Sequence, residues 1–165
     1  EVDYVGPMII SDAKKVLVLL TEIADINGLI ADLAADSVMA KIIGSIPGYG
    51  NTNMSELTGE IGTTTRFKGE GGLALYIGMC PLANSSGKYT GTKNTLQVNQ
   101  RAKRAMMNGL YHHIAQVPES RKFYDKKRAE GKSHNQALRS LGRHMIRVIW
   151  SLLKQNRYYE IRDTS

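Results

Sequence analysis

The sequence is short of cysteine and of long apolar runs. Its single cysteine, Cys80, excludes an intrachain disulfide and favours a reducing compartment. The longest aliphatic run, Val16 to Leu20, is far too short to cross a membrane, and we expect no secretory leader. We therefore expect no membrane partner. Because the chain opens on Glu1 without a methionine, we also expect it to be part of a longer protein.

Acidic residues are scarce in the second part of the chain. Residues 1–60 carry three lysines against nine acidic residues, a net charge of −6. Residues 61–165 carry nineteen Lys and Arg against six acidic residues, a net charge of +13. This segregation predicts that the second part binds a polyanion, most often nucleic acid, although a basic face that keeps the protein soluble is an alternative. So few carboxylates argue against a self-contained metal-dependent nuclease.

The histidines lack the spacing of a metal site. His112 and His113 are adjacent, so in a helix they point about 100° apart and cannot share one ion. His134 and His144 have no cysteine or carboxylate near them at ligand spacing. We expect neither a metal nor another cofactor to be bound by this chain alone.

No segment alternates over enough residues to form a convincing strand, so the sequence predicts an all-α fold. We expect a connector helix in residues 1–42 and a helical domain in residues 43–165. The connector helix should start at a Ser11 or Asp12 cap and run to Leu33, about 33 Å of helix. Its apolar residues are spaced 3-4-3-4-3, as in a coiled coil, at Val16, Leu19, Ile23, Ile26, Ile30 and Leu33. This seam should pack against a second protomer or a missing N-terminal part, or else fold back on the chain's own helices.

The segment Ile46-Pro47-Gly48-Tyr49-Gly50, between two short helical pieces, has the pattern of a helix-hairpin-helix. Gly48 and Gly50 would let the backbone approach a phosphate, and the N–H groups of the second helix would point at the anion. A simple reversal between two helices is the alternative. The acidic Glu56 and Glu60 count somewhat against phosphate binding, and we expect them to lie on the face away from the strand.

The segment from Cys80 to Thr92 is rich in glycine, hydroxyl and amide residues, which predicts a flexible loop. A serine hydroxyl in it is inert unless a base, a metal or flanking cations stabilise its alkoxide. Ser86 precedes Gly87 and is followed by cations that would favour the alkoxide and attract a phosphodiester: Lys88, Lys93, Arg101 and Arg104. From spacing alone, an ordinary loop is the better interpretation.

Three helices should complete the domain: an amphipathic helix from Leu96 to Gln116, a short charged helix over residues 119–131, and a long helix capped by Ser133 and ending near Gln155. On the last helix, Arg139, Arg143 and Arg147 repeat every four residues, either as a nucleic-acid contact or as a solvated face. The tyrosines are too scattered along the sequence to predict a base-stacking platform.

The order of these features resembles the C-terminal transposase domain of the DEDD-type insertion-sequence transposases, the family that includes the Piv pilin-gene invertases. The resemblance covers nearly all of residues 43–158, and the preceding helix matches the family's connector between its two domains. Its motifs are Ile46 to Gly50, Gly59-Glu60-Ile61-Gly62, Arg66-Phe67, Tyr76-Ile77-Gly78 with Pro81, Ser86-Gly87, Asn99, Tyr124, Lys127-Arg128, Glu130-Gly131-Lys132, Ala137 and Tyr158.

The resemblance implies a DNA recombinase of the prokaryotic cytoplasm, associated with the nucleoid. In this family the C-terminal domain supplies a serine that attacks DNA, and a RuvC-like N-terminal domain holds divalent metal, Mg²⁺, with four acidic residues. The family serine precedes a glycine, which maps it to Ser86. The residue before it is often an amide and is Ser85 here, which makes Ser85 the second choice. Family members act as multimers, and many are guided by an RNA encoded beside the gene.

We therefore expect the C-terminal half of a transposase, with Ser86 as nucleophile and with DNA and a guide RNA as partners. Its N-terminal helix should form a homo-oligomer, and alone the chain should bind nucleic acid without cleaving it. Two rival functions are a non-catalytic helix-hairpin-helix module and a helical oligomerisation domain. The residues expected to contact nucleic acid are Gly48, Gly50, Lys88, Lys93, Arg101, Arg104, Arg139, Arg143 and Arg147.

Overall fold

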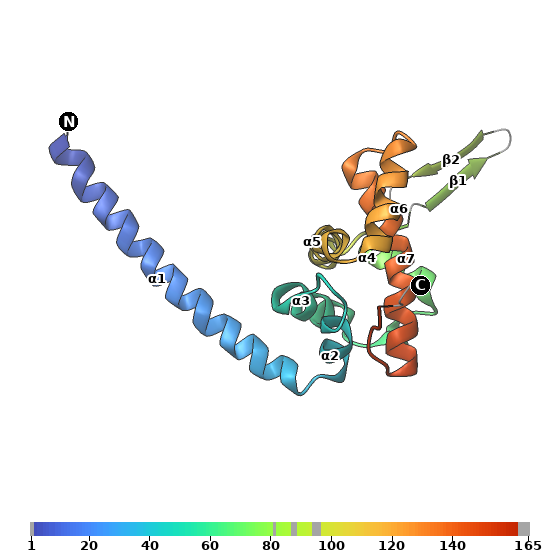
Figure 1. Ribbon diagram of the computed structural model, residues 1–165, viewed down its shortest axis with the longest axis horizontal. Coiled ribbons are helices and arrows are strands. Elements are labelled where there is room, and N and C mark those ends of the chain that lie inside the picture. The colour runs from blue at the N-terminus through green and yellow to red at the C-terminus, as the bar shows by residue number, and fades with distance from the viewer. Residues whose placement is uncertain (1, 81, 87–88, 94–96, 162–165) are drawn as a thin grey trace. The chain divides into compact units, whose positions relative to one another are not determined.

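The computed structural model describes residues 2–80, 82–86, 89–93 and 97–161, and gives the backbone alone for residues 2–4, 82–86 and 89–93 (Figure 1). The chain divides into two compact units, residues 1–36 and 37–165. The sequence placed this boundary after residue 42. The structure instead assigns the short helix that begins at Val38 to the second unit.

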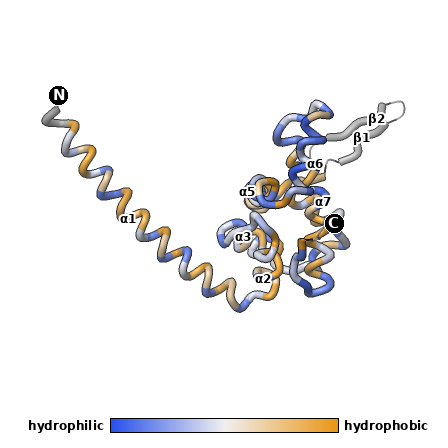
Figure 2. The backbone as a smooth tube through the Cα atoms, in the orientation of Figure 1, coloured by the Kyte–Doolittle hydropathy of each residue, from blue (hydrophilic) through white to orange (hydrophobic). Residues whose placement is uncertain are grey.

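The first unit is one long helix, α1 (Val2–Ala35). It begins well before the predicted cap at Ser11 or Asp12, so that expectation was wrong. Pro7 lies inside the helix. A proline there removes one backbone hydrogen bond, but its fixed φ is compatible with helix. The tube in Figure 2 shows apolar residues recurring along the length of α1. Most of the seam predicted from the 3-4 spacing is exposed, including Leu19 and Ile26, each 55% exposed.

The second unit is helical, which confirms the all-α fold class. Its helices are α2 (Val38–Gly44), α3 (Asn51–Ile61), the 3-10 turn η1 (Thr64–Arg66), α4 (Glu70–Ile77), α5 (Gln100–Gln116), α6 (Pro118–Ala129) and α7 (His134–Gln155). Helices α5, α6 and α7 pack against one another, α3 packs against α5, and α2 packs against α3 (Figure 1). The short helix α4 lies against α5 and α7.

The core comes largely from apolar stripes on the two longest helices of this unit. On α5 the stripe from Ala102 to Ile114 is buried, and on α7 the stripe from Leu138 to Leu152 is buried except for Val148, which is half-buried. Ser133 caps α7 in a reciprocal capping box with Gln136, as its position predicted. These two helices form the scaffold on which the shorter elements pack.

The segment after α4 differs from the sequence prediction. Where a flexible loop was expected between Cys80 and Thr92, the backbone forms an antiparallel hairpin of β1 (Leu82–Ser86) and β2 (Tyr89–Lys93) (Figure 1). The loop prediction was therefore wrong. Its basis was the lack of apolar side chains, but paired strands satisfy their backbone groups with each other and do not require them.

The start of α5 follows from local chemistry. The helix expected from Leu96 begins at Gln100, because the side chain of Asn99 accepts a hydrogen bond from the backbone N–H of Ala102 and so caps it. Within the described part of the chain, no helix is both long enough and apolar enough to cross a membrane.

Candidate nucleic-acid interface

The turn between α2 and α3 is fixed by close packing against α5. Gly48 has a φ of +91°, and a Cβ there would lie 2.4 Å from the backbone nitrogen of His113. On the α5 side, a Cβ at Gly109 would lie 2.5 Å from the Tyr49 ring. The tyrosine is itself buried, with its hydroxyl 3.2 Å from the Met106 sulfur. This packing accounts for Gly48 without any ligand, so its contact with nucleic acid stays a prediction.

His113, on α5, holds the same turn in place. It is fully buried, and its Nδ1 lies 2.6 Å from the carbonyl oxygen of Pro47. A carbonyl only accepts, so Nδ1 carries the proton and Nε2, which has no partner among the described residues, is unprotonated. Burial lowers the pKa of His113. The ring is therefore neutral at pH 7 and acts as a structural donor to the turn.

Gly50 lies on the outer side of the turn and is exposed. It caps α3 with no side-chain hydrogen bond, and a Cβ there would meet nothing within 4 Å. The first backbone N–H groups of α3 border a cavity of about 510 Å³ that is also lined by His112 and Gln116 of α5. The N-terminus of α3 is therefore exposed, and its contact with a phosphate, through Gly50, stays a prediction.

A polar network joins the C-terminus of α3 to the end of α4 and to the start of α5. Arg66 donates to the carbonyl oxygens of Glu60 and Ile61 at 2.9 and 3.0 Å, and its guanidinium lies 5.3 Å from the centroid of the Tyr76 ring. The Asn99 amide donates to the Glu60 carboxylate and to the Tyr76 hydroxyl, both at 2.6 Å. This network fixes the start of α5 against the ends of α3 and α4.

The predicted nucleophile lies on the hairpin. Ser86 is the last residue of β1 and pairs with Tyr89, and Ser85 pairs with Thr90. Lys93 ends β2, and Lys88 lies outside the described residues. The chain enters this segment after Cys80 and leaves it before Val98, and both residues line one cavity of the helical domain. The base of the serine-bearing segment is therefore at the wall of that cavity.

The two arginines expected to attract the strand from α5 have acidic partners on α3. Arg101 lies 3.7 Å from the Glu60 carboxylate, and Arg104 lies 3.4 Å from that of Glu56. Both arginines stay largely exposed, at 75% and 67%. Exposed pairs of this kind contribute little to stability, about 0–1 kcal/mol, and leave donor groups for a further anion. The two glutamates thus lie beside the predicted basic residues.

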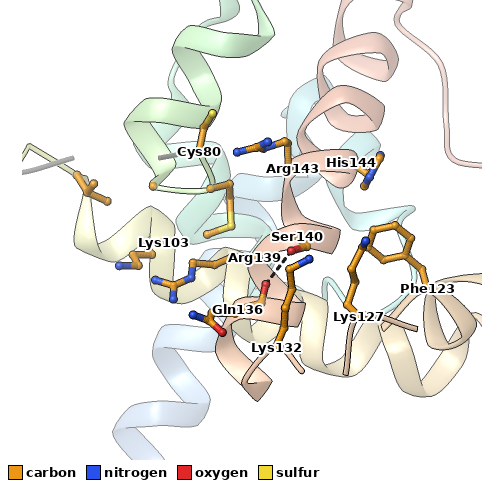
Figure 3. Close-up of a pocket in the computed structure, with 13 residues that line it drawn as sticks. Cys80, Lys103, Phe123, Lys127, Lys132, Gln136, Arg139, Ser140, Arg143 and His144 are labelled. Carbon is orange, nitrogen blue, oxygen red and sulfur yellow. Dashed lines mark hydrogen bonds between the residues drawn. The ribbon is translucent and has the colours of Figure 1, made fainter. Parts of the chain in front are cut away.

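The cavity beside the hairpin, here called the basic cavity, is lined largely by cationic side chains (Figure 3). Its volume is about 720 Å³, and its wall is formed by α5, α6 and α7 together with residues that follow α4. Two of the three α7 arginines of the predicted stripe line it, whereas Arg147 lies outside and pairs with Glu70 at 3.2 Å. Its cationic or titratable side chains are Lys103, Lys127, Lys132, Arg139, Arg143 and His144.

Electrostatics in the basic cavity are dominated by these cations. Burial, followed by the positive charges of Arg147, Arg143 and Lys127, lowers the pKa of His144, so its ring is neutral at pH 7. Glu130 accepts hydrogen bonds from Lys127 and Lys132, at 2.8 and 3.0 Å, which lowers its pKa to about 2. The cavity therefore presents an excess of positive charge that one carboxylate only partly offsets.

The donor set does not fit a metal. Across the described parts of the chain, no three His, Cys, Asp or Glu side chains lie close enough together to hold an ion.

Comparison with known proteins settles the family. The model of the transposase IS116/IS110/IS902 family matches residues 40–125, more than half of the chain. The chain belongs to this family. The match includes the turn at Gly48, the Glu60 network and the hairpin, so the resemblance drawn from the motifs is confirmed.

Individual relatives of the family agree. The chain is 34% identical, over 93% of its length, to an insertion element IS900 uncharacterized 42 kDa protein of Mycobacterium paratuberculosis. It is 34% identical, over 75% of its length, to an insertion element IS110 uncharacterized 43.6 kDa protein of Streptomyces coelicolor. A pilin gene-inverting protein of Moraxella bovis is 24% identical over 74% of the chain. The matches cover 39%, 31% and 39% of these relatives, so the chain spans well under half of each.

Sequence reasoning missed part of the basic cavity. Lys103, Lys127 and Lys132 lie on or beside three different helices, and only the packing of α5, α6 and α7 brings them together. The signal available in the sequence was the density of cations in α6 and in the turn before α7. For this transposase-family chain, that density indicated charge but not a cavity.

Proposed function

We propose that this chain is the C-terminal half of a DNA transposase that supplies Ser86 as the nucleophile and grips the nucleic-acid backbone. The single observation that supports this best is the position of the serine segment. Its first and last neighbours in the described chain, Cys80 and Val98, both line the basic cavity. A phosphodiester attracted to that cavity would lie at the base of the hairpin that bears the serine.

The proposed step is an exchange of ester bonds at phosphorus. The Ser86 oxygen attacks the phosphorus of a DNA phosphodiester, and a bond forms between them. The bond from phosphorus to the oxygen of the departing strand breaks, and that oxygen takes up the serine proton to leave a free hydroxyl end. The cations of the basic cavity would hold the DNA backbone at the base of the hairpin, at the other end of β1 from Ser86. Ser85, its neighbour on β1, is the alternative nucleophile.

The proposed transposase would also require a metal, nucleic acid and a second copy of the chain. Divalent metal, Mg²⁺, would be held by acidic residues of a RuvC-like domain that this sequence does not contain. DNA would bind through Gly50 at the N-terminus of α3 and through Arg139 and Arg143. An RNA guide would bind through the same residues, because its backbone also carries negative phosphates. The exposed seam of α1 would pair with a second copy as a coiled coil. Such a protein would act on the nucleoid in the prokaryotic cytoplasm.

The test is a recombination assay in a protein that joins this chain to the metal-binding domain. We expect Ser86→Ala to abolish strand exchange while DNA binding is retained, and Ser85→Ala to leave strand exchange within about twofold of the starting protein. A covalent protein–DNA intermediate should be trapped with Ser85→Ala and not with Ser86→Ala.

The opposite pattern, with loss in Ser85→Ala alone, would transfer the nucleophile to Ser85. Unchanged strand exchange in both variants would reject a serine nucleophile. It would favour the second candidate, a helix-hairpin-helix module that binds nucleic acid without catalysis. The open N-terminus of α3 beside Gly50 and His112 is the observation that favours that candidate.

A further inference from the structure

We propose that the basic cavity receives a single nucleotide, unstacked from its strand, with the phosphate on the cations and the base against the apolar wall. The proposal rests on the nucleic-acid function proposed above and adds the form in which the ligand is bound. The size of the cavity is the first argument. At about 720 Å³ it lies within the range of sites that enclose small ligands, about 300–1,000 Å³. A stacked duplex is too wide to enter such a cavity, whereas one extruded nucleotide fits.

The charge of the wall is the second argument. Lys103 on α5, together with Arg139 and Arg143 on α7, lines the cavity, and none of the three has an ion-pair partner among the residues that the structure describes. Lys127 and Lys132 are already paired with Glu130. Three free cations from two helices provide a site for a phosphate, since both guanidinium groups can donate two parallel hydrogen bonds to its oxygens.

The rest of the wall is unlike that of a simple phosphate site. Val98 and Phe123 are half-buried there and present apolar surface. The Phe123 ring is held edge-on to His144, with ring centroids 4.9 Å apart. The backbone N–H of Ser133 donates to the Gln136 Oε1, which leaves the amide N–H groups of Gln136 free to donate to a base edge. Apolar surface, ring edges and an amide donor are the groups that bind nucleobases.

The experiment compares three probes by isothermal titration calorimetry on the 165-residue chain: adenosine 5′-monophosphate, adenosine and inorganic phosphate. We expect the monophosphate to bind at least tenfold more tightly than either of the others, because only it occupies both parts of the cavity. Equal affinity for phosphate and the monophosphate would overturn the proposal, since the cavity would then be a phosphate site only. Absence of monophosphate binding would overturn it as well.

Variants assign the two parts. Arg139→Gln should weaken both the monophosphate and phosphate, whereas Phe123→Leu should weaken the monophosphate and leave phosphate unchanged. Arg121→Gln is the matched charge control, because Arg121 lies on α6 outside the cavity and pairs with Asp125. Phe123→Leu keeps an apolar side chain at this position. A urea titration of the variant, followed by Trp150 fluorescence, shows whether its fold is intact.

Oligonucleotides test whether the cavity binds a nucleotide that belongs to a strand or only a free nucleotide. A single-stranded oligonucleotide with one central abasic site, in an otherwise thymine sequence, should bind several-fold more weakly than its intact counterpart, and Phe123→Leu should remove the difference. No difference between the two oligonucleotides would overturn insertion of a base from a strand. Monophosphate binding without oligonucleotide binding would reject the proposed function and identify the ligand as a free nucleotide.

Discussion

The Nδ1 atom of His113 lies 2.6 Å from the carbonyl oxygen of Pro47, so a fully buried imidazole on α5 holds the turn between α2 and α3. That hydrogen bond fixes the tautomer and leaves the unprotonated Nε2 facing the interior. A second proton on the ring would place an unpaired charge in the core. The turn that bears Gly50 is thereby coupled to the protonation of one histidine.

Stability should fall in mild acid because of this histidine. Burial lowers the folded-state pKa of His113 below its ordinary value of about 6.5, so below that pH the unfolded chain binds more protons. We expect the urea midpoint to be constant above about pH 7 and to fall as the pH drops below about 6.5. His113→Asn, which keeps a donor toward Pro47, should be less stable at pH 7 but less sensitive to acid. An unchanged acid sensitivity in this variant would assign the effect to other groups, such as His144.

Gly48 and Gly50 should respond in opposite ways to the same change. Gly48→Ala places a Cβ 2.4 Å from the backbone of His113 at a φ of +91° and should cost about 2 kcal/mol or more of unfolding free energy. Gly50→Ala meets nothing within 4 Å and should stay within about 0.5 kcal/mol of the starting protein. Urea unfolding followed by Trp150 fluorescence measures both. Similar losses in the two variants would contradict the close packing of the turn on α5.

Asn99 should contribute to stability in two separable ways. Asn99→Ser keeps a helix cap but loses the donor to Glu60 and Tyr76, whereas Asn99→Ala loses both. We expect the serine variant to lose about 1 kcal/mol and the alanine variant about 1 kcal/mol more. Equal losses would show that the contacts with Glu60 and Tyr76 alone matter and that the cap contributes nothing measurable. Thermal and urea unfolding at pH 7 make the comparison.

The α7 arginines should differ in their contribution to nucleic-acid binding. Arg143 lines the basic cavity, whereas Arg147 lies outside it and already pairs with Glu70. Arg143→Gln should weaken binding of an oligonucleotide and reduce the slope of log affinity against log salt by about one, and Arg147→Gln should change the slope by less. Fluorescence anisotropy at salt concentrations from about 50 to about 200 mM measures the slope. A flat salt response of the starting protein would reject electrostatic binding altogether.

The seam of α1 should control the association state. Leu19 and Ile26 are each 55% exposed, so replacing both with glutamate should leave the chain folded but shift it to monomer. Thr21→Glu with Gly28→Glu adds the same charges at the same spacing away from the seam and should leave association unchanged. Analytical ultracentrifugation compares the two double variants. A starting protein that is already monomeric at all concentrations would contradict pairing through this seam.

The amino-acid sequence alone determined the helical class, the apolar faces of α5 and α7, the Ser133 cap and the family. Helical periodicity and capping are local properties, so they can be read from residues within one or two turns of each other. The motif at Ile46 to Gly50 likewise predicted a turn between two helices. The resemblance to transposases added Ser86, for which local chemistry alone gave little support.

Tertiary structure decided what these elements do together. Three lysines from α5, α6 and the turn before α7 meet two arginines of α7 in the basic cavity, while the third arginine of the predicted stripe, Arg147, turns to Glu70. The hairpin replaced a predicted loop because strand pairing depends on backbone groups rather than on side-chain pattern. Contacts between residues far apart in the chain are set by how the helices pack against one another, which no local spacing records. For that reason the sequence identified the charge and the family, and only the fold placed the cations around one cavity at the base of the serine segment.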